Sequence, residues 1–176
     1  MEDSKHGLQP ESIHQNKRNM KSFSWSSTRI AIVYSEWNSV VTEAMKEGAI
    51  KALKGKGVLE ENIQLIACPG AYEIPLALKM VLDRNKNKMD DTIHGLVALG
   101  AVIQGETPHF DVINQGVTQG IMRLMLDTGT PIGFGILTTH TVQQAMDRAN
   151  PAKGNKGAEA ALAMCSMLEV KFDLGH

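Results

Sequence analysis

Apolar and polar positions change their spacing repeatedly along most of the chain. Residues 30–34 form a short, nearly continuous apolar run, Ile-Ala-Ile-Val-Tyr, which is rich in β-branched side chains and typical of a buried parallel strand. Apolar residues then recur at spacings of three and four from Val41 to Leu53, ahead of Gly55 and Gly57. This spacing predicts a helix with one apolar face that ends near the two glycines.

The same alternation of strand and helix patterns continues toward the C-terminus. Further strands are predicted at residues 63–67, 93–99 and 132–137. Further helices are predicted at residues 74–82, 111–126, 142–149 and 158–170. Because strands alternate with helices over short connections, we expect a four-stranded parallel sheet with helices on both faces. The predicted fold class is therefore α/β, with three layers in the order α/β/α.

The N-terminal segment follows neither period. Its charges are mixed, with acidic and basic side chains at Glu2, Asp3, Lys5, Glu11, Lys17, Arg18 and Lys21. We expect residues 1–28 to be a flexible arm and residues 29–176 to form the folded domain. Near the end of the arm, Phe23 and Trp25 lie among serines, and this short stretch could pair with another element as a strand.

Composition narrows the class of protein. The chain has 176 residues, of which 43% are apolar, and a formal net charge of -1, so it can build one core and lacks the basic excess of most nucleic-acid binders. No apolar run is long enough to span a membrane, and the N-terminal segment lacks the apolar stretch of a secretory signal. Cys68 and Cys165 lie in apolar surroundings, which indicates buried, reduced thiols in a cytoplasmic protein.

Common motifs for nucleotides, metals and a serine nucleophile are absent from the sequence. Gly55 and Lys56 are followed by Gly57 rather than Ser or Thr, at the end of a predicted helix, so they do not form a P-loop. No GxGxxG follows a predicted strand, and there is no HExxH, CxxC or GxSxG. The sequence therefore gives no support for a dinucleotide-binding fold and no signal for a metal site.

Ligands of open α/β sheets bind beyond the carboxyl ends of the strands. The segments expected there are residues 35–38, 69–73, 100–109 and 138–140. Residues 100–111 are interpreted as a long loop, in which Gly105, Thr107 and the following amides could cradle a phosphate at a helix entrance. His109 stands beside this place, and an imidazole is a side chain that can both accept and donate protons in catalysis. Considered alone, a loop histidine is more often a surface or capping residue.

Several of these segments carry a joint pattern. Residues 69–75 read Pro-Gly-Ala-Tyr-Glu-Ile-Pro, and residues 100–111 read Gly-Ala-Val-Ile-Gln-Gly-Glu-Thr-Pro-His-Phe-Asp. Residues 135–139 read Gly-Ile-Leu-Thr-Thr, and Arg148 is followed by Gly-Asn-Lys-Gly at residues 154–157. Taken together, in this order and at this approximate spacing, the motifs resemble the 6,7-dimethyl-8-ribityllumazine synthase family over nearly all of the folded chain.

The resemblance implies a flavodoxin-like fold and a specific reaction. The family condenses 5-amino-6-(D-ribitylamino)uracil with 3,4-dihydroxy-2-butanone 4-phosphate, releases phosphate and water, and forms the lumazine precursor of riboflavin. It needs no metal or organic cofactor. Its members form homo-oligomers, as pentamers or as twelve pentamers in an icosahedral shell, and the active site is shared between subunits. The connection at residues 150–157 has no long insertion, and this length is compatible with assembly into a shell.

The resemblance also implies roles for the residues that match. Trp37 would stack on the pyrimidine ring. The residues that would hold the ribityl chain are Ala71, Tyr72 and Glu73. The residues whose backbone would contact the uracil edge are Ala101, Val102 and Ile103.

The remaining matches concern the phosphate and proton transfer. The phosphate-binding turn would consist of Gly105, Glu106 and Thr107. His109 would be the general acid and base. Arg148 and Phe134 would reach the site from the neighbouring subunit, and that Arg148 would pair with the phosphate. Lys156 is a weaker candidate for the same electropositive region.

Two positions depart from the family pattern. Trp37 stands where Phe is usual, and its larger ring could favour flavin-like ligands. Gln104 stands where many members have Arg, which reduces positive charge near the phosphate. The alternative function is therefore a paralogue that binds riboflavin or a lumazine and has weak synthase activity. A further alternative is a shell-forming structural protein.

Overall fold

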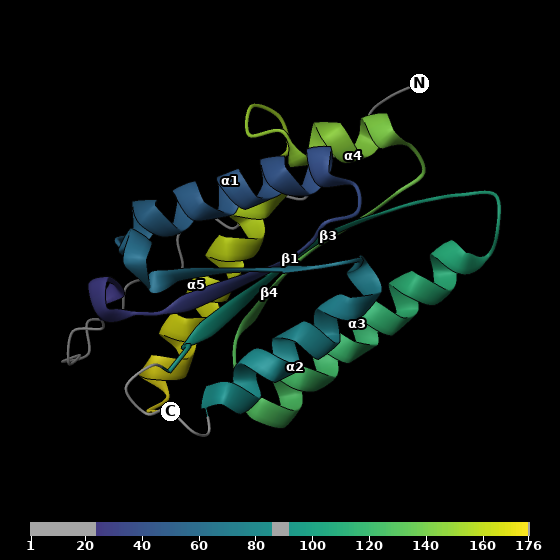
Figure 1. The fold of residues 1–176 in the computed structure, drawn as a ribbon. Helices are drawn as coiled ribbons and strands as arrows, with labels where there is room; N and C mark the ends of the chain where they lie inside the picture. The colour runs from purple at the N-terminus through teal and green to yellow at the C-terminus, as the bar shows by residue number, and fades with distance from the viewer. Residues whose placement is uncertain (1–23, 86–91, 176) are drawn as a thin grey trace.

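The fold is built on one parallel sheet with the strand order β2-β1-β3-β4 (Figure 1). The computed structural model describes residues 24–85 and 92–175. Its strands are β1 (Ile30–Ser35), β2 (Ile63–Cys68), β3 (Gly95–Ile103) and β4 (Ile132–Thr139). All three strand pairs are parallel, with Ile30 opposite Ile63 and Gly95. The connections between consecutive strands therefore have to cross a face of the sheet, and helices make these crossings.

Helices cover both faces of the sheet (Figure 1). One layer consists of α1 (Ser39–Lys56), α4 (Val142–Ala149) and α5 (Lys156–Asp173). The other consists of α2 (Ile74–Asn85) and α3 (His109–Thr128). The predicted three-layer α/β/α class is therefore confirmed, and the flavodoxin-like expectation agrees with this layering.

Alternation along the central strands divides the core into two halves. Ile30 and Ile32 of β1 belong to the cluster under α1 and α5, whereas Ala31 and Val33 belong to the cluster under α2 and α3. Side chains of a strand point alternately to its two faces, so a continuous apolar run supplies both clusters. This is why the predicted buried strands lack an alternating polar pattern.

Glycines let α5 approach its neighbours closely. A Cβ atom on Gly157 would lie 1.9 Å from the carbonyl oxygen of Met45 in α1. A Cβ atom on Gly133 of β4 would lie 2.1 Å from the carbonyl oxygen of Ala160. Both positions thus require the absence of a side chain, and they fix α5 between α1 and the sheet.

The third strand is longer than the sequence pattern predicts. Residues 100–103 were expected to begin a loop, but they continue β3 and pair with residues 136–139 of β4. Gly100 does not break the strand because it is a position of close approach, where a Cβ atom would lie 3.1 Å from Cδ1 of Ile74. Pairing with β1 stops at Leu99, and β1 ends at Ser35, so residues 101–103 of β3 project beyond β1.

The N-terminal segment joins the fold before β1. A short 3₁₀ turn spans Trp25–Ser27, and Trp25 packs against the cluster under α1. The ammonium group of Lys56 lies 5.6 Å from the centre of the Trp25 ring. The rest of the predicted arm, including Phe23 and its proposed strand pairing, lies outside the described residues. Within residues 24–85 and 92–175, no helix is both long and apolar enough to cross a bilayer.

Candidate active site

The four segments expected to carry chemistry meet at one end of the sheet. The turn after β1, the connection from β2 to α2, the loop from β3 to α3 and the turn from β4 to α4 all lie at the carboxyl ends of the parallel strands (Figure 1). Parallel pairing is the cause, because it brings the ends of all four strands to the same edge. The site is therefore assembled by topology from residues that are far apart in sequence.

Trp37 and Glu73 converge on Gly70. A Cβ atom on Gly70 would lie 2.6 Å from Cε3 of Trp37 and 2.9 Å from Oε2 of Glu73. The indole is two-thirds exposed, although its backbone is fixed by the amide of Trp37, which donates 3.0 Å to the carbonyl oxygen of Pro69. An exposed aromatic surface thus stands beside a carboxylate, which suits a ligand with both a flat ring and hydroxyl groups.

The carboxylate of Glu73 has an unsatisfied buried atom. Its Oε2 is shielded from solvent and has no hydrogen-bond partner. Glu73 ends the short 3₁₀ turn Ala71–Glu73, directly before α2, where the helix dipole favours a negative charge. A buried acceptor without a donor costs free energy, so the site is prepared for a ligand that donates a hydrogen bond there.

Ala71 packs beside Gly100 of β3 in the same part of the site. It is buried, and a Cβ atom on Gly100 would lie 3.4 Å from the Cβ of Ala71. Tyr72, in contrast, points elsewhere. A Cβ atom on Gly116 in α3 would lie 2.9 Å from Cε2 of Tyr72, so this ring lies along α3 rather than beside Trp37.

The projecting end of β3 presents main-chain groups on its β1 side. Ala101 and Val102 are buried, and Ile103 is partly buried. Asn38 donates a hydrogen bond of 2.8 Å from Nδ2 to the carbonyl oxygen of Ala101. The sequence interpretation did not name Asn38, although its segment was expected at the site. Its left-handed backbone, with φ 59°, is one that Asn adopts more readily than most residues.

The loop after β3 leads into an uncapped helix. Gly105, Glu106 and Thr107 are exposed, and Gly105 has open space around it. Helix α3 has Pro108 at its N-cap and no side-chain hydrogen bond there. Free amides at the start of a long helix attract anions. His109 is the first residue of α3 and is exposed, so it stands next to these amides.

Phe134 lies away from these loops within one chain. It is opposite Ala98 in the middle of β4, on the edge of the sheet, and is 44% exposed. At about 3.3 Å per residue, it lies roughly 16 Å before the end of that strand. Its ring is therefore presented to the outside of the chain rather than to the site beside Trp37.

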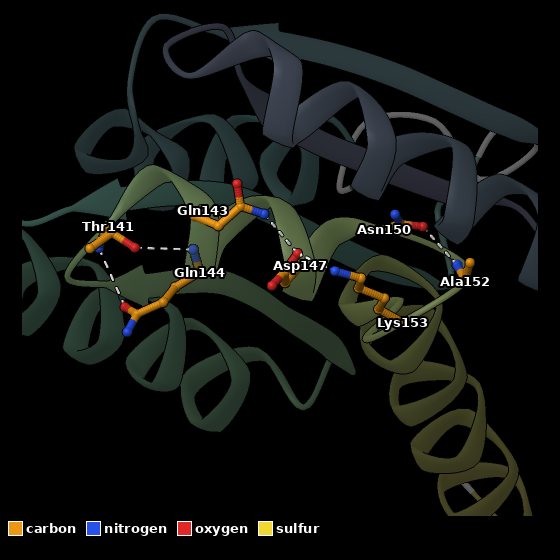
Figure 2. Close-up of polar contacts among 7 residues, drawn as sticks. All are labelled: Thr141, Gln143, Gln144, Asp147, Asn150, Ala152 and Lys153. Carbon is orange, nitrogen blue, oxygen red and sulfur yellow. Dashed lines mark hydrogen bonds and ion pairs between the residues drawn. The ribbon is translucent and has the colours of Figure 1, made fainter.

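Arg148 belongs to the short helix α4. Figure 2 shows polar contacts at both ends of this helix. Thr141 and Gln144 form a capping box, with Gln144 N donating 3.1 Å to Thr141 Oγ1. Beyond the helix, Lys153 Nζ donates 2.7 Å to Asp147. A Cβ atom on Gly154 would lie 2.7 Å from the Cα of Arg148. The guanidinium itself is on an exposed residue.

Layering separates Arg148 from His109. Helix α4, which carries Arg148, covers the opposite face of the sheet from α3, which begins at His109 (Figure 1). Lys156 is held by a 2.6 Å ion pair with Glu159, in the first turn of α5. The structure thus gathers Trp37, Glu73 and the end of β3, and it leaves the cationic candidates outside this group.

Neither cysteine has the properties of a nucleophile. Both are free and buried. Burial raises the pKa of Cys68 to about 11, and the nearby carboxylates of Glu73 and Glu36 act in the same direction. Burial likewise raises the pKa of Cys165 to about 11. The thiolate forms are therefore scarce near neutral pH.

Two other features of the described residues lie outside this site. No group of three or more His, Cys, Asp or Glu that could hold a metal occurs within residues 24–85 and 92–175. An apolar groove of about 600 Å³ lies at the other end of the molecule, between the C-terminal turns of α3 and α5, with Met122, Leu126 and Val170 among its lining residues. Its lining is mostly apolar, and its polar side chains are those of Thr128, Thr130 and Lys171.

Comparison with known proteins gives one consistent result. Residues 27–171 match the family model described as 6,7-dimethyl-8-ribityllumazine synthase. A protein of that name from Chlorobium phaeovibrioides is 43% identical over 148 residues, which cover 84% of this chain and 92% of the relative. Another from Campylobacter jejuni is 40% identical over 149 residues, which cover 85% and 93%.

Proposed function

Because the chain belongs to the 6,7-dimethyl-8-ribityllumazine synthase family, we propose that it condenses 5-amino-6-(D-ribitylamino)uracil with 3,4-dihydroxy-2-butanone 4-phosphate. The product is 6,7-dimethyl-8-ribityllumazine, the penultimate compound of riboflavin biosynthesis. The chain is an enzyme, a transferase of this family. The proposal needs no cofactor, since both substrates already carry the reacting groups.

The observation that carries the proposal is the pairing of Trp37 with Glu73. The exposed indole offers a stacking surface for the pyrimidine ring. The buried Oε2 of Glu73, which lacks a partner, is an acceptor for a ribityl hydroxyl. Both groups border the space beside Gly70 that a Cβ atom would occupy, so one ligand can reach the two together. Main-chain groups of Ala101, Val102 and Ile103 would then face the uracil edge.

The chemistry proceeds through two condensations. The 5-amino group of the uracil attacks the ketone carbon, and loss of water gives an imine. A proton leaves the adjacent carbon, the phosphate departs with the carbon–oxygen electron pair, and the resulting enol tautomerises to a ketone. The ribitylamino nitrogen then attacks this ketone, and loss of a second water closes the ring. Holding both reactants in one orientation can contribute roughly 7–11 kcal/mol to such a reaction.

His109 moves the protons in this scheme. It would accept the proton from the carbon next to the imine and return a proton during tautomerisation, which is worth about 10²–10⁴-fold in rate for a well-placed group. The phosphate would lie against Gly105, Glu106 and Thr107 at the start of α3, where free amides favour an anion. A neutral or cationic environment there helps the phosphate to leave.

The cationic groups would come from a second copy of the chain. Arg148 lies on the opposite layer from His109, and Phe134 stands exposed on the edge strand, so one chain alone does not surround the phosphate. We therefore propose a homo-oligomer with shared sites, a pentamer or a shell of pentamers, in which Arg148, Phe134 and Lys156 face the neighbouring site. The free thiols support a cytoplasmic location, where thiols stay reduced.

Turnover with the two purified substrates tests the proposal. Lumazine formation and phosphate release in equal amounts are expected. Titration with riboflavin, followed by quenching of its fluorescence, is run beside it. Tight flavin binding without turnover would overturn the synthase assignment. Sedimentation that gives only monomers with full activity would overturn the shared site.

A further inference from the structure

A polar chain links the turn before α4 to the loop that follows β3. The ring Nδ1 of His140 is hydrogen-bonded to the side-chain oxygen Oε1 of Gln104. An amide oxygen can only accept, so the imidazole donates from Nδ1. Gln104 also anchors its own backbone, because its amide donates 2.8 Å to the carbonyl oxygen of Thr139. Main chain and side chain of Gln104 are thus both tied to the end of β4.

His140 is itself held from two sides. Its backbone amide donates 2.9 Å to Oε1 of Gln144, and Gln144 is a member of the capping box of α4. Its ring stacks on that of Phe110, with 6.4 Å between ring centres and 29° between planes. Phe110 in turn packs against the core under α3. A side chain fixed in this way loses little further freedom when it orients a neighbour.

The bond from His140 determines which end of the Gln104 amide is available. Oε1 is occupied by His140, whereas the Nε2 donors have no hydrogen-bond partner among residues 24–85 and 92–175. Gln104 directly precedes Gly105, Glu106 and Thr107, and the helix after them has no side-chain cap. A pair of free amide donors therefore stands at the beginning of an anion-attracting loop.

We propose that Gln104 donates from Nε2 to the phosphate of the substrate, and that His140 is the positioning residue that turns the amide toward it. This inference rests on the proposed function, because it names the group that recognises one of its two substrates. A neutral amide takes this place without adding a positive charge. Recognition thus depends on orientation, which His140 supplies, rather than on long-range attraction.

Three variants separate positioning from structural support. His140→Ala removes the donor, and His140→Asn keeps one, because the amide nitrogen of Asn can occupy the place of Nδ1. Gln104→Ala removes the proposed phosphate contact. Gln143→Ala is the matched control in the adjacent helix α4, since the side chain of Gln143 donates its hydrogen bond to Asp147 at 2.9 Å and not to Gln104 or His140.

The KM for the butanone phosphate is the decisive measurement. Loss of one hydrogen bond corresponds to an increase of about three- to tenfold, so His140→Ala and Gln104→Ala should each raise this KM by that factor. The kcat and the KM for the uracil substrate should stay unchanged. His140→Asn should stay within about twofold of the unmodified protein, and the double alanine variant should be no worse than either single variant because both changes remove one interaction.

Other results would overturn the inference. They are an unchanged KM in Gln104→Ala, additive effects in the double variant, or an increase in His140→Asn equal to that in His140→Ala. Where His140→Ala does not fold, Gln104→Ala alone decides. Titration with inorganic phosphate separates this inference from the proposed function. Phosphate binding that weakens in both alanine variants would support it even without turnover, whereas turnover with unchanged phosphate binding would contradict it.

Discussion

Asn38 Nδ2 lies 2.8 Å from the carbonyl oxygen of Ala101 and donates a hydrogen bond to it. This bond joins the turn after β1 to the part of β3 that extends beyond β1. It therefore fixes how far the main chain at the end of β3 stands from the turn that carries Trp37. A planar heterocycle can stack on Trp37 and bond to the main chain of β3 at the same time only if these two are the right distance apart.

Substitution of Asn38 should separate binding from stability. Asn38→Gly tolerates the left-handed backbone (φ 59°) and loses only the hydrogen bond, so the KM for the uracil substrate should rise about two- to tenfold. Asn38→Ala also strains the backbone and should lose about 1–2 kcal/mol of unfolding free energy. Steady-state kinetics and urea unfolding measure the two effects. Equal stability of both variants would contradict the role assigned to the backbone.

Substitution of Glu73 should weaken substrate binding without lowering the stability of the free protein. Glu73→Gln removes the charge of a carboxylate whose Oε2 is buried without a partner. A hydrogen bond to a charged group is worth about 1.5–3 kcal/mol, so the KM for the ribityl substrate should rise about tenfold or more. The free protein should unfold at the same or a higher urea concentration. A clear loss of stability would mean that Glu73 supports the fold rather than the ligand.

His109 and Arg148 give a test of the shared site. His109→Ala should lower kcat by about 10²–10⁴-fold with little change in KM, and Arg148→Ala should raise the KM for the phosphate substrate. When the two impaired variants are unfolded together in equal amounts and refolded as mixed oligomers, about a quarter of the interfaces in a ring should carry both intact residues. Activity should therefore return after mixing. Mixtures without recovered activity would place both residues in one chain's site.

Gly157 tests the contact between α5 and α1. A Cβ atom there would lie 1.9 Å from the carbonyl oxygen of Met45, so Gly157→Ala should lose about 1–3 kcal/mol of unfolding free energy through overpacking. Gly55 is the matched control, because it is also helical and has nothing within 4 Å of its Cβ position. Gly55→Ala should gain up to about 1 kcal/mol through helix propensity. Denaturant unfolding of the two variants measures the contrast.

The buried thiols predict a loss of stability at alkaline pH. Burial raises the pKa of Cys165 from an ordinary value near 9 to about 11. Between these values the unfolded chain has lost a proton that the folded chain retains. The contribution of the buried, protonated thiol to the free energy of unfolding is therefore complete below pH 9 and declines as pH rises toward 11. Cys165→Ala should flatten the dependence of unfolding free energy on pH over this range. An identical slope in both proteins would contradict it.

The fold was largely predictable because its signals are local. Continuous apolar runs identified all four strands, and three- and four-residue spacing identified the main helices. The principal error concerned residues 100–103, which continue β3. Gly100 resembled the start of a loop, and only the tertiary structure shows that it is glycine because Ile74 and Ile136 lie against it.

The site was predictable in part. Trp37 and Glu73 were named from the sequence, and the parallel topology brings both to Gly70. Asn38 lay in a segment expected at the site but received no role, because its role depends on a carbonyl oxygen 63 residues away. The same holds for His140, whose bond to Gln104 spans 36 residues. Spacing along the chain carries no information about such pairs.

The edge strand β4 has one further consequence. Gly133 and Gly135 lie under α5, where any side chain would collide with Ala160 or Leu99. On the other side of the strand Ile132 and Ile136 are buried, and only Phe134 and Thr138 are exposed. Changes at positions 134 and 138 therefore leave the contact with α5 intact. A single strand thus carries both the exposed side chains that another copy of the chain can meet and the glycines that must remain as they are for the chain to fold at all.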